Sequence, residues 1–173
     1  YKMGLRMVGP VHFKNNQFGD SSTDPDGPQF DGLSPLGEAL VKKANELGII
    51  LDGSHSSDAL LEDMIELSKT PVILSHSGTK AVYDHPRNVD DALLKKLVAS
   101  GGVIHVNAYS SYLTELPSDP ERRKAFGVLM KQMGSLSDMT PEQIAAFKAQ
   151  RKQIEMEHPA VKATFEDYMA HFL

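Results

Sequence analysis

The sequence predicts an α/β fold built on a parallel sheet, because strand-like and helix-like segments alternate along most of the chain. The strand-like segments lie at 5–12, 49–55, 71–76 and 103–109. Four such strands make about half of an eight-stranded barrel, which is the architecture we expect. The alternative is a doubly wound sheet, but no glycine-rich phosphate loop follows any of these strands.

The first strand is followed by a long loop and then by a helix with clear end signals. Residues 13–32 are rich in Asn, Asp, Ser, Gly and Pro, and loops of that length often serve a function. Ser34 suits the cap position of a helix, Pro35 its first turn and Gly48 its end. The apolar residues that we expect on its buried face are Leu36, Leu40, Val41, Ala44 and Leu47.

Further helices follow, and one region departs from the alternation. A helix is predicted over 57–69, and Asn88 can cap another. Residues 117–158 are charged, helical and free of strand patterns, with a capping box at 140–143. We expect an inserted helical hairpin there, with a solvated face; a lid or a homodimer contact is the alternative. A last helix is predicted from Thr164.

Composition excludes several classes of protein. The 173 residues, 40% hydrophobic and 24% charged, suit a soluble domain with a core, and the net charge of −5 argues against a nucleic-acid partner. The absence of cysteine excludes disulfides, zinc fingers and thiol catalysis. No apolar run approaches the roughly 20 residues of a transmembrane helix. The first residue is not Met, so we expect the natural N-terminus upstream, and the compartment stays undetermined.

Two histidines carry the strongest functional signal. His55 ends the segment 49–55 and His76 ends the segment 71–76, each within a Ser-His-Ser triplet. Neighbouring strands lie about 4.8 Å apart. We therefore expect both imidazoles side by side at the carboxyl edge of the sheet, where α/β proteins place active sites. Two imidazoles this close can share one transition metal, and zinc suits them best. The alternative is two unrelated polar residues at strand ends.

Other side chains near these strand ends are candidates for substrate binding. Arg87 can clamp a substrate carboxylate, although position alone favours a surface arginine. Asn88 beside it is a helix cap and a candidate substrate contact. His12 ends the first strand and is a candidate catalytic residue that donates a hydrogen bond to a substrate carbonyl oxygen, or is an ordinary loop histidine. Tyr109 shares strand parity with His105, so it either lines a pocket or packs inside a barrel.

Longer motifs resemble the membrane dipeptidase (renal dipeptidase) family of zinc peptidases. The motifs are YKMGLRMVGPVHFKNN at 1–16, GLSPLGEALVKKANELGIILDGSHSS at 32–57, TPVILSHSGTKAVYDHPRNVDDALL at 70–94 and GGVIHVNAYSSYL at 101–113. The resemblance covers 1–113 and the last helix, and it leaves out the segment 117–158.

This resemblance implies a (β/α)₈ TIM-type barrel of the metal-dependent hydrolase kind, with two Zn²⁺ ions at its carboxyl face and dipeptides as substrates. His55 and His76 match the two histidine ligands of one zinc. His12 matches a histidine that hydrogen-bonds the substrate, and Arg87 matches an arginine that binds the substrate carboxylate. Tyr109 falls where the family lines its pocket.

The sequence also departs from the family. The family's other zinc is held by a His-x-Asp pair and a bridging glutamate that precede the matched region, and a catalytic aspartate follows it. We therefore expect 1–173 to be a single partial metallo-hydrolase barrel domain that supplies ligands for one of two zinc ions. Two other hypotheses stay open: a non-catalytic half-barrel that binds metal or a partner, and a hydrolase of another amide or an N-acyl amino acid. A carboxylate clamp at Arg87 favours dipeptides.

Overall fold

The computed structural model of the chain describes residues 1–133 and 139–173, and these form two compact units. The first unit comprises Tyr1–Glu115 and Ala163–Leu173, and the second comprises Leu116–Lys162. The first unit holds all of the candidate residues for metal and substrate binding.

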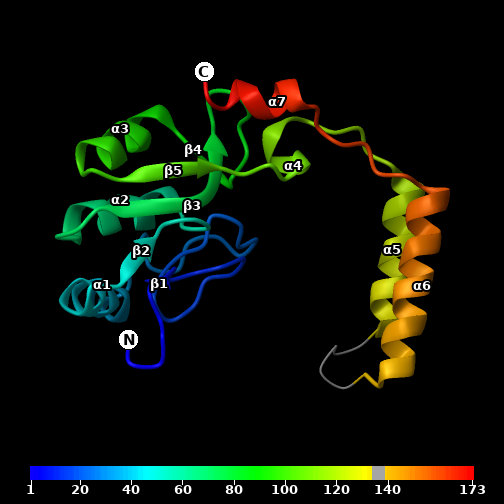
Figure 1. Cartoon of the computed structure of the whole chain (residues 1–173), viewed down its shortest axis with the longest axis horizontal. Helices are drawn as coiled ribbons and strands as arrows, with labels where there is room; N and C mark the ends of the chain where they lie inside the picture. The colour runs from blue at the N-terminus through cyan, green and yellow to red at the C-terminus, as the bar shows by residue number, and fades with distance from the viewer. Residues whose placement is uncertain (134–138) are drawn as a thin grey trace. The chain divides into compact units, whose positions relative to one another are not determined.

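The strands of the described residues form one parallel sheet in the first unit (Figure 1). β2 pairs with β1 on one side and with β3 on the other. The far side of β3 pairs with β5 and, at its carboxyl end, with β4. This confirms the predicted parallel α/β fold. The strands are β1 (Met7–Val8), β2 (Ile50–Asp52), β3 (Val72–Thr79), β4 (Asn88–Val89) and β5 (Val103–Val106).

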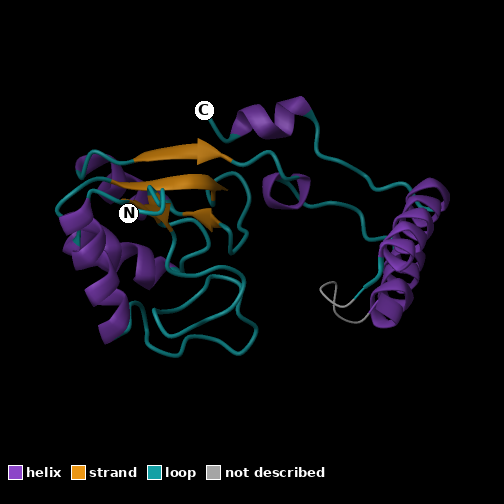
Figure 2. Ribbon diagram, turned by 60° about the horizontal axis from the view of Figure 1, so that its bottom comes forward, coloured by secondary structure: helices purple, strands orange, loops and turns teal. Residues whose placement is uncertain are grey.

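The helices α1 (Pro35–Leu47), α2 (Asp58–Leu67) and α3 (Asp91–Ala99) pack against one face of the sheet. Figure 1 shows them in sequence order beside β2, β3 and β5, and Figure 2 shows helices and strands as separate layers. Leu51, Val72 and Leu74 face this layer and belong to the core, whereas Met7, Ile50 and Val103 of the other parity are 44–49% exposed. The fully buried core includes Val41, Leu51, Leu60, Met64, Leu74 and Leu97.

The helix ends follow local capping chemistry, with one correction. The Ser34 side chain accepts a hydrogen bond from the Gly37 amide, and Gly48 ends α1 in the left-handed conformation at φ 65°, as predicted. The cap of α3 is Asp90, which accepts from the Leu93 amide, so the prediction that Asn88 caps this helix is wrong. Asn88 lies in β4 instead, where its backbone belongs to the strand ladder.

Several predicted strands are shorter than expected, because a strand ends where its hydrogen-bonded neighbour ends and not where the apolar pattern ends. β1 stops at Val8, so His12 follows in a loop. β5 stops at Val106, and the short helix α4 (Ser110–Leu113) begins soon after. Strand parity therefore does not extend from His105 to Tyr109. The predicted core residues Leu36 and Leu47 of α1 are also largely exposed.

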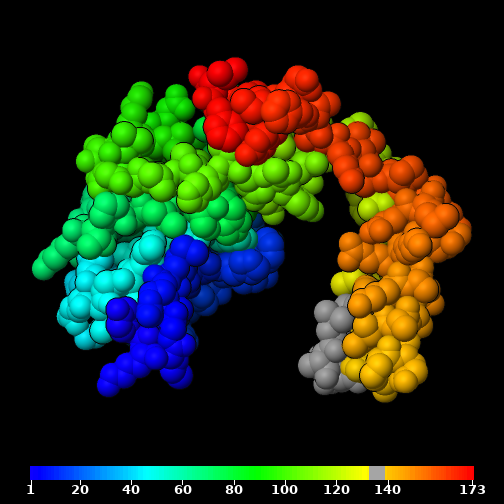
Figure 3. All heavy atoms as spheres, in the orientation of Figure 1, coloured from blue at the N-terminus to red at the C-terminus, as the bar shows by residue number. Residues whose placement is uncertain are grey.

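The chain end returns to the sheet through α7 (Phe165–Ala170), which begins with a capping box at Thr164. His171 follows it and is buried, with 5% of its surface exposed. Its Nδ1 accepts a hydrogen bond from the Thr79 amide, and its Nε2 lies 3.0 Å from the Leu113 carbonyl oxygen. In Figure 3 the red residues of α7 lie directly against the segment that contains α4.

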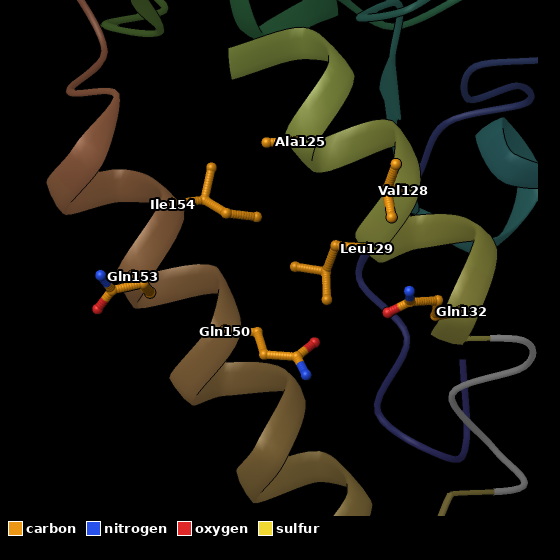
Figure 4. Close-up of a pocket in the computed structure, with 7 residues that line it drawn as sticks. All are labelled: Ala125, Val128, Leu129, Gln132, Gln150, Gln153 and Ile154. Atoms are coloured by element: carbon orange, nitrogen blue, oxygen red, sulfur yellow. The ribbon is translucent and has the colours of Figure 1, made fainter. Parts of the chain in front are cut away.

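The second unit consists of α5 (Pro120–Met133) and α6 (Pro141–Glu157), a pair of helices that pack on each other. The predicted capping box is present, since Thr140 and Gln143 exchange hydrogen bonds. Leu129 and Ile154 point toward one another beside a cavity of about 240 Å³ between the helices (Figure 4). Among the residues described, no helix is long and apolar enough to span a membrane. A lid or homodimer role for this unit stays a prediction.

Candidate metal and substrate site

The imidazoles of His55 and His76 meet at the carboxyl side of the sheet, as predicted, although their places in the strands differ. His55 lies beyond the end of β2, whereas His76 lies inside β3. The prediction that His76 ends its strand is wrong, because pairing of Gly78 with Asn88 extends β3 to Thr79. The two Nε2 atoms are nevertheless only 2.9 Å apart.

His55 sits in an unusual backbone conformation. Its φ is 73°, in the left-handed region that residues with a Cβ atom rarely adopt. The Ser22 amide donates to the His55 carbonyl oxygen at 2.8 Å and helps to hold this turn. The side chain is buried, and its Nδ1 has no hydrogen-bond partner among the described residues. Backbone strain of this kind clusters at functional sites.

His76 is held by a chain of hydrogen bonds from two strands. Its Nδ1 lies 2.6 Å from the Ser75 hydroxyl oxygen, which in turn lies 2.5 Å from an oxygen of Asp52. The other Asp52 oxygen accepts from the amides of Ser54 and Ser75, both at 3.0 Å. Burial raises the pKa of Asp52, but the hydrogen bonds from Ser75 and Ser54 outweigh it and leave that pKa below its ordinary value.

Sequence analysis missed Asp52. The available signal was an acidic residue directly after the apolar run Ile49–Leu51, where a carboxylate is expected to be buried and therefore to need partners. Its partner Ser75 belongs to the neighbouring strand, and only the register between the strands brings the two together.

Both imidazoles are neutral at neutral pH. Burial, followed by the positive charge of Arg87 and the nearby His12 and His76, lowers the pKa of His55 to about 4. Burial and Arg87 also lower the pKa of His76. A neutral imidazole offers a lone pair to a metal, so these environments favour the state that a metal ligand needs.

The geometry of this pair fits two positions of a tetrahedral zinc site. Ligand nitrogens at about 2.05 Å from a tetrahedral ion lie roughly 3.3 Å apart, close to the 2.9 Å between the two Nε2 atoms. Within the described residues, no group of three or more His, Asp or Glu side chains is placed to hold a metal. The residues present therefore fit part of a metal site.

Arg87 is buried next to this pair, so the interpretation as a surface arginine is wrong. Only 2% of its surface is exposed. One guanidinium nitrogen donates to the His76 carbonyl oxygen at 3.1 Å, and the guanidinium lies 5.5 Å from the ring centre of Tyr112. Within the described part of the chain, its Nε has no hydrogen-bond partner and no carboxylate lies within ion-pair distance of the guanidinium. A buried cation without a counter-ion is costly, which favours binding of an anion here.

The remaining predicted residues lie at different distances from this centre. The His12 ring is exposed and packs on the His55 ring at 4.2 Å between centres. Tyr109 is exposed and packs on Tyr112, so it reaches Arg87 only through that ring. Asn88 is buried, and its amide group donates to the carbonyl oxygens of Tyr83 and Tyr112. Its contribution is thus to brace the loops around Arg87.

Solved structures share this arrangement of strands and helices. The probable dipeptidase PvdM from Pseudomonas aeruginosa superimposes with a TM-score of 0.72 at 27% identity, over 99% of this chain and 47% of its own. A metallo peptidase from Rhodobacter sphaeroides, solved with a phosphinate mimic of the dipeptide L-Ala-D-Ala, gives a TM-score of 0.60 at 34% identity, over 66% of this chain and 33% of its own. The α/β fold is thus part of a TIM-type barrel, as predicted.

Sequence comparisons agree. Dipeptidase verJ of Clonostachys rogersoniana is 42% identical over 106 residues, 61% of this chain and 27% of its own. An uncharacterized dipeptidase of Schizosaccharomyces pombe is 37% identical over 120 residues, 69% of this chain and 29% of its own. The chain spans less than a third of the length of these curated relatives. The family model for membrane dipeptidases, peptidase family M19, matches residues 1–173, and the chain belongs to that family.

Proposed function

We propose that the natural full-length protein is a zinc-dependent dipeptidase in which His55 and His76 bind one Zn²⁺ through their Nε2 atoms. The approach of these two nitrogens to 2.9 Å carries the proposal, together with the family match over the whole chain. Zinc bound there would act as a Lewis acid and lower the pKa of a bound water. Other residues would supply the remaining ligands of this zinc and the ligands of the family's second zinc.

The side chains around the pair suit one end of a dipeptide. Arg87 would bind the substrate carboxylate, which would supply a counter-ion that the described residues do not give this buried guanidinium. His12, exposed beside His55, would donate a hydrogen bond to the substrate. Tyr109 would line the outer part of the pocket through its contact with Tyr112. A direct contact between Asn88 and substrate stays a prediction, because both amide hydrogens of Asn88 already bind backbone carbonyls.

The test uses Arg87→Ala and Arg87→Lys in the natural full-length protein, with L-Ala-D-Ala and L-Ala-L-Ala as substrates. Hydrogen bonds to charged groups contribute about 1.5–3 kcal/mol, so we expect Arg87→Ala to raise KM by about 10- to 100-fold. Arg87→Lys keeps the charge but loses the planar fork and should recover part of the loss.

A matched substrate pair distinguishes the proposal from hydrolysis of other amides. Arg87→Ala should leave the slow hydrolysis of a dipeptide amide, which lacks the carboxylate, unchanged within twofold. Unaltered dipeptide KM in Arg87→Ala would exclude the carboxylate clamp. Faster hydrolysis of N-acyl amino acids than of any dipeptide would replace the dipeptidase function with an acylase function.

A further inference from the structure

A buried carboxylate that binds no metal in the proposed site is connected to it through one hydroxyl group. Asp52 ends β2, is 8% exposed and accepts hydrogen bonds from Ser75 of the neighbouring strand β3. Its two oxygens accept three hydrogen bonds, from the Ser54 amide, the Ser75 amide and the Ser75 hydroxyl. The same hydroxyl oxygen lies 2.6 Å from Nδ1 of His76.

The direction of each hydrogen bond in this chain follows from the groups involved. An ionised carboxylate can only accept, so the Ser75 hydroxyl donates its single hydrogen to Asp52. That hydroxyl then has no hydrogen left for His76, and the short contact with Nδ1 requires that Nδ1–H donate to the Ser75 oxygen. Nε2 of His76 is left without a hydrogen, and its lone pair faces His55.

We propose that Asp52 is a positioning residue, which acts through the Ser75 hydroxyl to fix His76 as the tautomer whose Nε2 is free to bind a metal. The consequence for zinc rests on the proposed function, whereas the tautomer itself does not. Partners of this kind orient a ligating histidine and set its tautomer. Here the contact is indirect, since a hydroxyl group lies between the carboxylate and the imidazole.

The substitution Asp52→Asn tests the direction of these hydrogen bonds and changes the shape of the side chain little. The Asn carbonyl oxygen can still accept from the amides of Ser54 and Ser75, but its NH₂ group now donates to the Ser75 oxygen. The Ser75 hydroxyl is then free to donate to Nδ1 of His76 at 2.6 Å, which is much nearer than its other acceptor, the Ser54 hydroxyl oxygen at 3.5 Å, and this moves the imidazole hydrogen to Nε2. The variant should therefore keep the fold and invert the tautomer.

The primary readout is the tautomer of His76 in the metal-free, ¹⁵N-labelled protein, from long-range ¹H–¹⁵N NMR spectra. The His76 signals are assigned by their loss in His76→Asn. We expect Nδ1–H in the wild type and Nε2–H in Asp52→Asn. The proposal would be overturned if the hydrogen of His76 lay on Nε2 in the wild type. It would also be overturned if a folded Asp52→Asn variant kept the wild-type tautomer.

Two variants of Ser75 keep the test decisive if Asp52→Asn does not fold. Ser75→Ala removes the hydroxyl and should give a mixture of both tautomers, whereas Ser75→Thr retains the hydroxyl and should restore Nδ1–H. A single Nδ1–H tautomer in Ser75→Ala would overturn the proposal, because the hydroxyl would then be unnecessary.

Zinc affinity gives a second readout, measured by competition with a chromophoric chelator. We expect Asp52→Asn and Ser75→Ala to weaken zinc binding by about 10- to 100-fold, the effect typical of losing an outer partner of a ligating histidine, and Ser75→Thr to stay near wild type. Equal affinity in all variants would overturn the role of Asp52 in metal binding. A wild type with the expected tautomer but no zinc at the histidines would instead refute the proposed function.

Discussion

The two histidines face one another but are held by different means. His76 lies inside a strand, and its Nδ1 is held by the Ser75 hydroxyl, which is itself hydrogen-bonded to Asp52. His55 lies outside its strand with φ at 73°, and its Nδ1 has no described partner. The comparison shows that one side of the site is organised by hydrogen bonds and the other by backbone conformation. Substitutions at the two positions should therefore have the same effect on zinc and different effects on the fold.

The largest expected effect is the loss of zinc. In His55→Ala and in His76→Ala, zinc affinity at this site should fall by more than about 100-fold, beyond the 10- to 100-fold typical of losing an outer partner. Zinc content and competition titrations measure this, with the exposed His105→Ala as the matched control. Full zinc occupancy in either variant would show that the imidazole in question is not a ligand.

The next effect is a dependence of the stability on pH. The pKa of His55 is about 4 in the folded protein and about 6.5 in the unfolded chain, so the unfolded chain binds more protons between these values. Stability of the metal-free protein should thus be unaffected above pH 6.5 and fall as the pH drops toward 4. At 1.36 kcal/mol per pKa unit, a difference of about 2.5 units sets an upper limit of about 3.4 kcal/mol on this loss.

Urea denaturation across this pH range measures the effect. His55→Asn carries no titrating group at this position and tolerates positive φ, so its stability should depend less on pH than that of the wild type. His76→Asn should also reduce the pH dependence, because the pKa of His76 is lowered too. Equal slopes in the wild type and in His55→Asn would contradict the buried, neutral state of His55.

The smallest effect concerns the backbone and reverses between the two positions. At position 55 the positive φ favours Gly over Ala, so His55→Gly should be more stable than His55→Ala by about 1 kcal/mol. Inside β3 the order is reversed, and His76→Ala should be more stable than His76→Gly by about 0.5–1 kcal/mol. Thermal unfolding of the four metal-free variants checks both differences. A His55→Ala variant that is more stable than His55→Gly would mean that His55 carries no backbone strain.

The parts of the fold that depend on local chemistry could be predicted from the sequence. Ser34, Gly48 and the capping box at Thr140 begin and end helices through groups within a few residues of one another. The lengths of strands could not be predicted in this way. β3 continues past His76 because β4 pairs with it, and β5 stops before Tyr109 because its ladder with β3 stops.

The residues of the site also divide into those that local sequence patterns predict and those that depend on packing between strands. Strand order brought His55 and His76 together, so their proximity was predictable from the alternation of strands and helices. The burial of Arg87 and the contact between Asp52 and Ser75 depend on packing and register across strands, which no local pattern encodes. Asn88 shows the converse: its sequence position suits a helix cap, yet its amide group is used to hold two backbone carbonyls.

The most direct test of the central claim is a crystal structure of the natural full-length protein with zinc, using anomalous scattering at the zinc edge to locate the ion. The account predicts a zinc peak about 2.0–2.1 Å from Nε2 of both His55 and His76. A zinc ion bound by only one of these imidazoles, or bound at other residues while both imidazoles remain in hydrogen-bond contact, would contradict it.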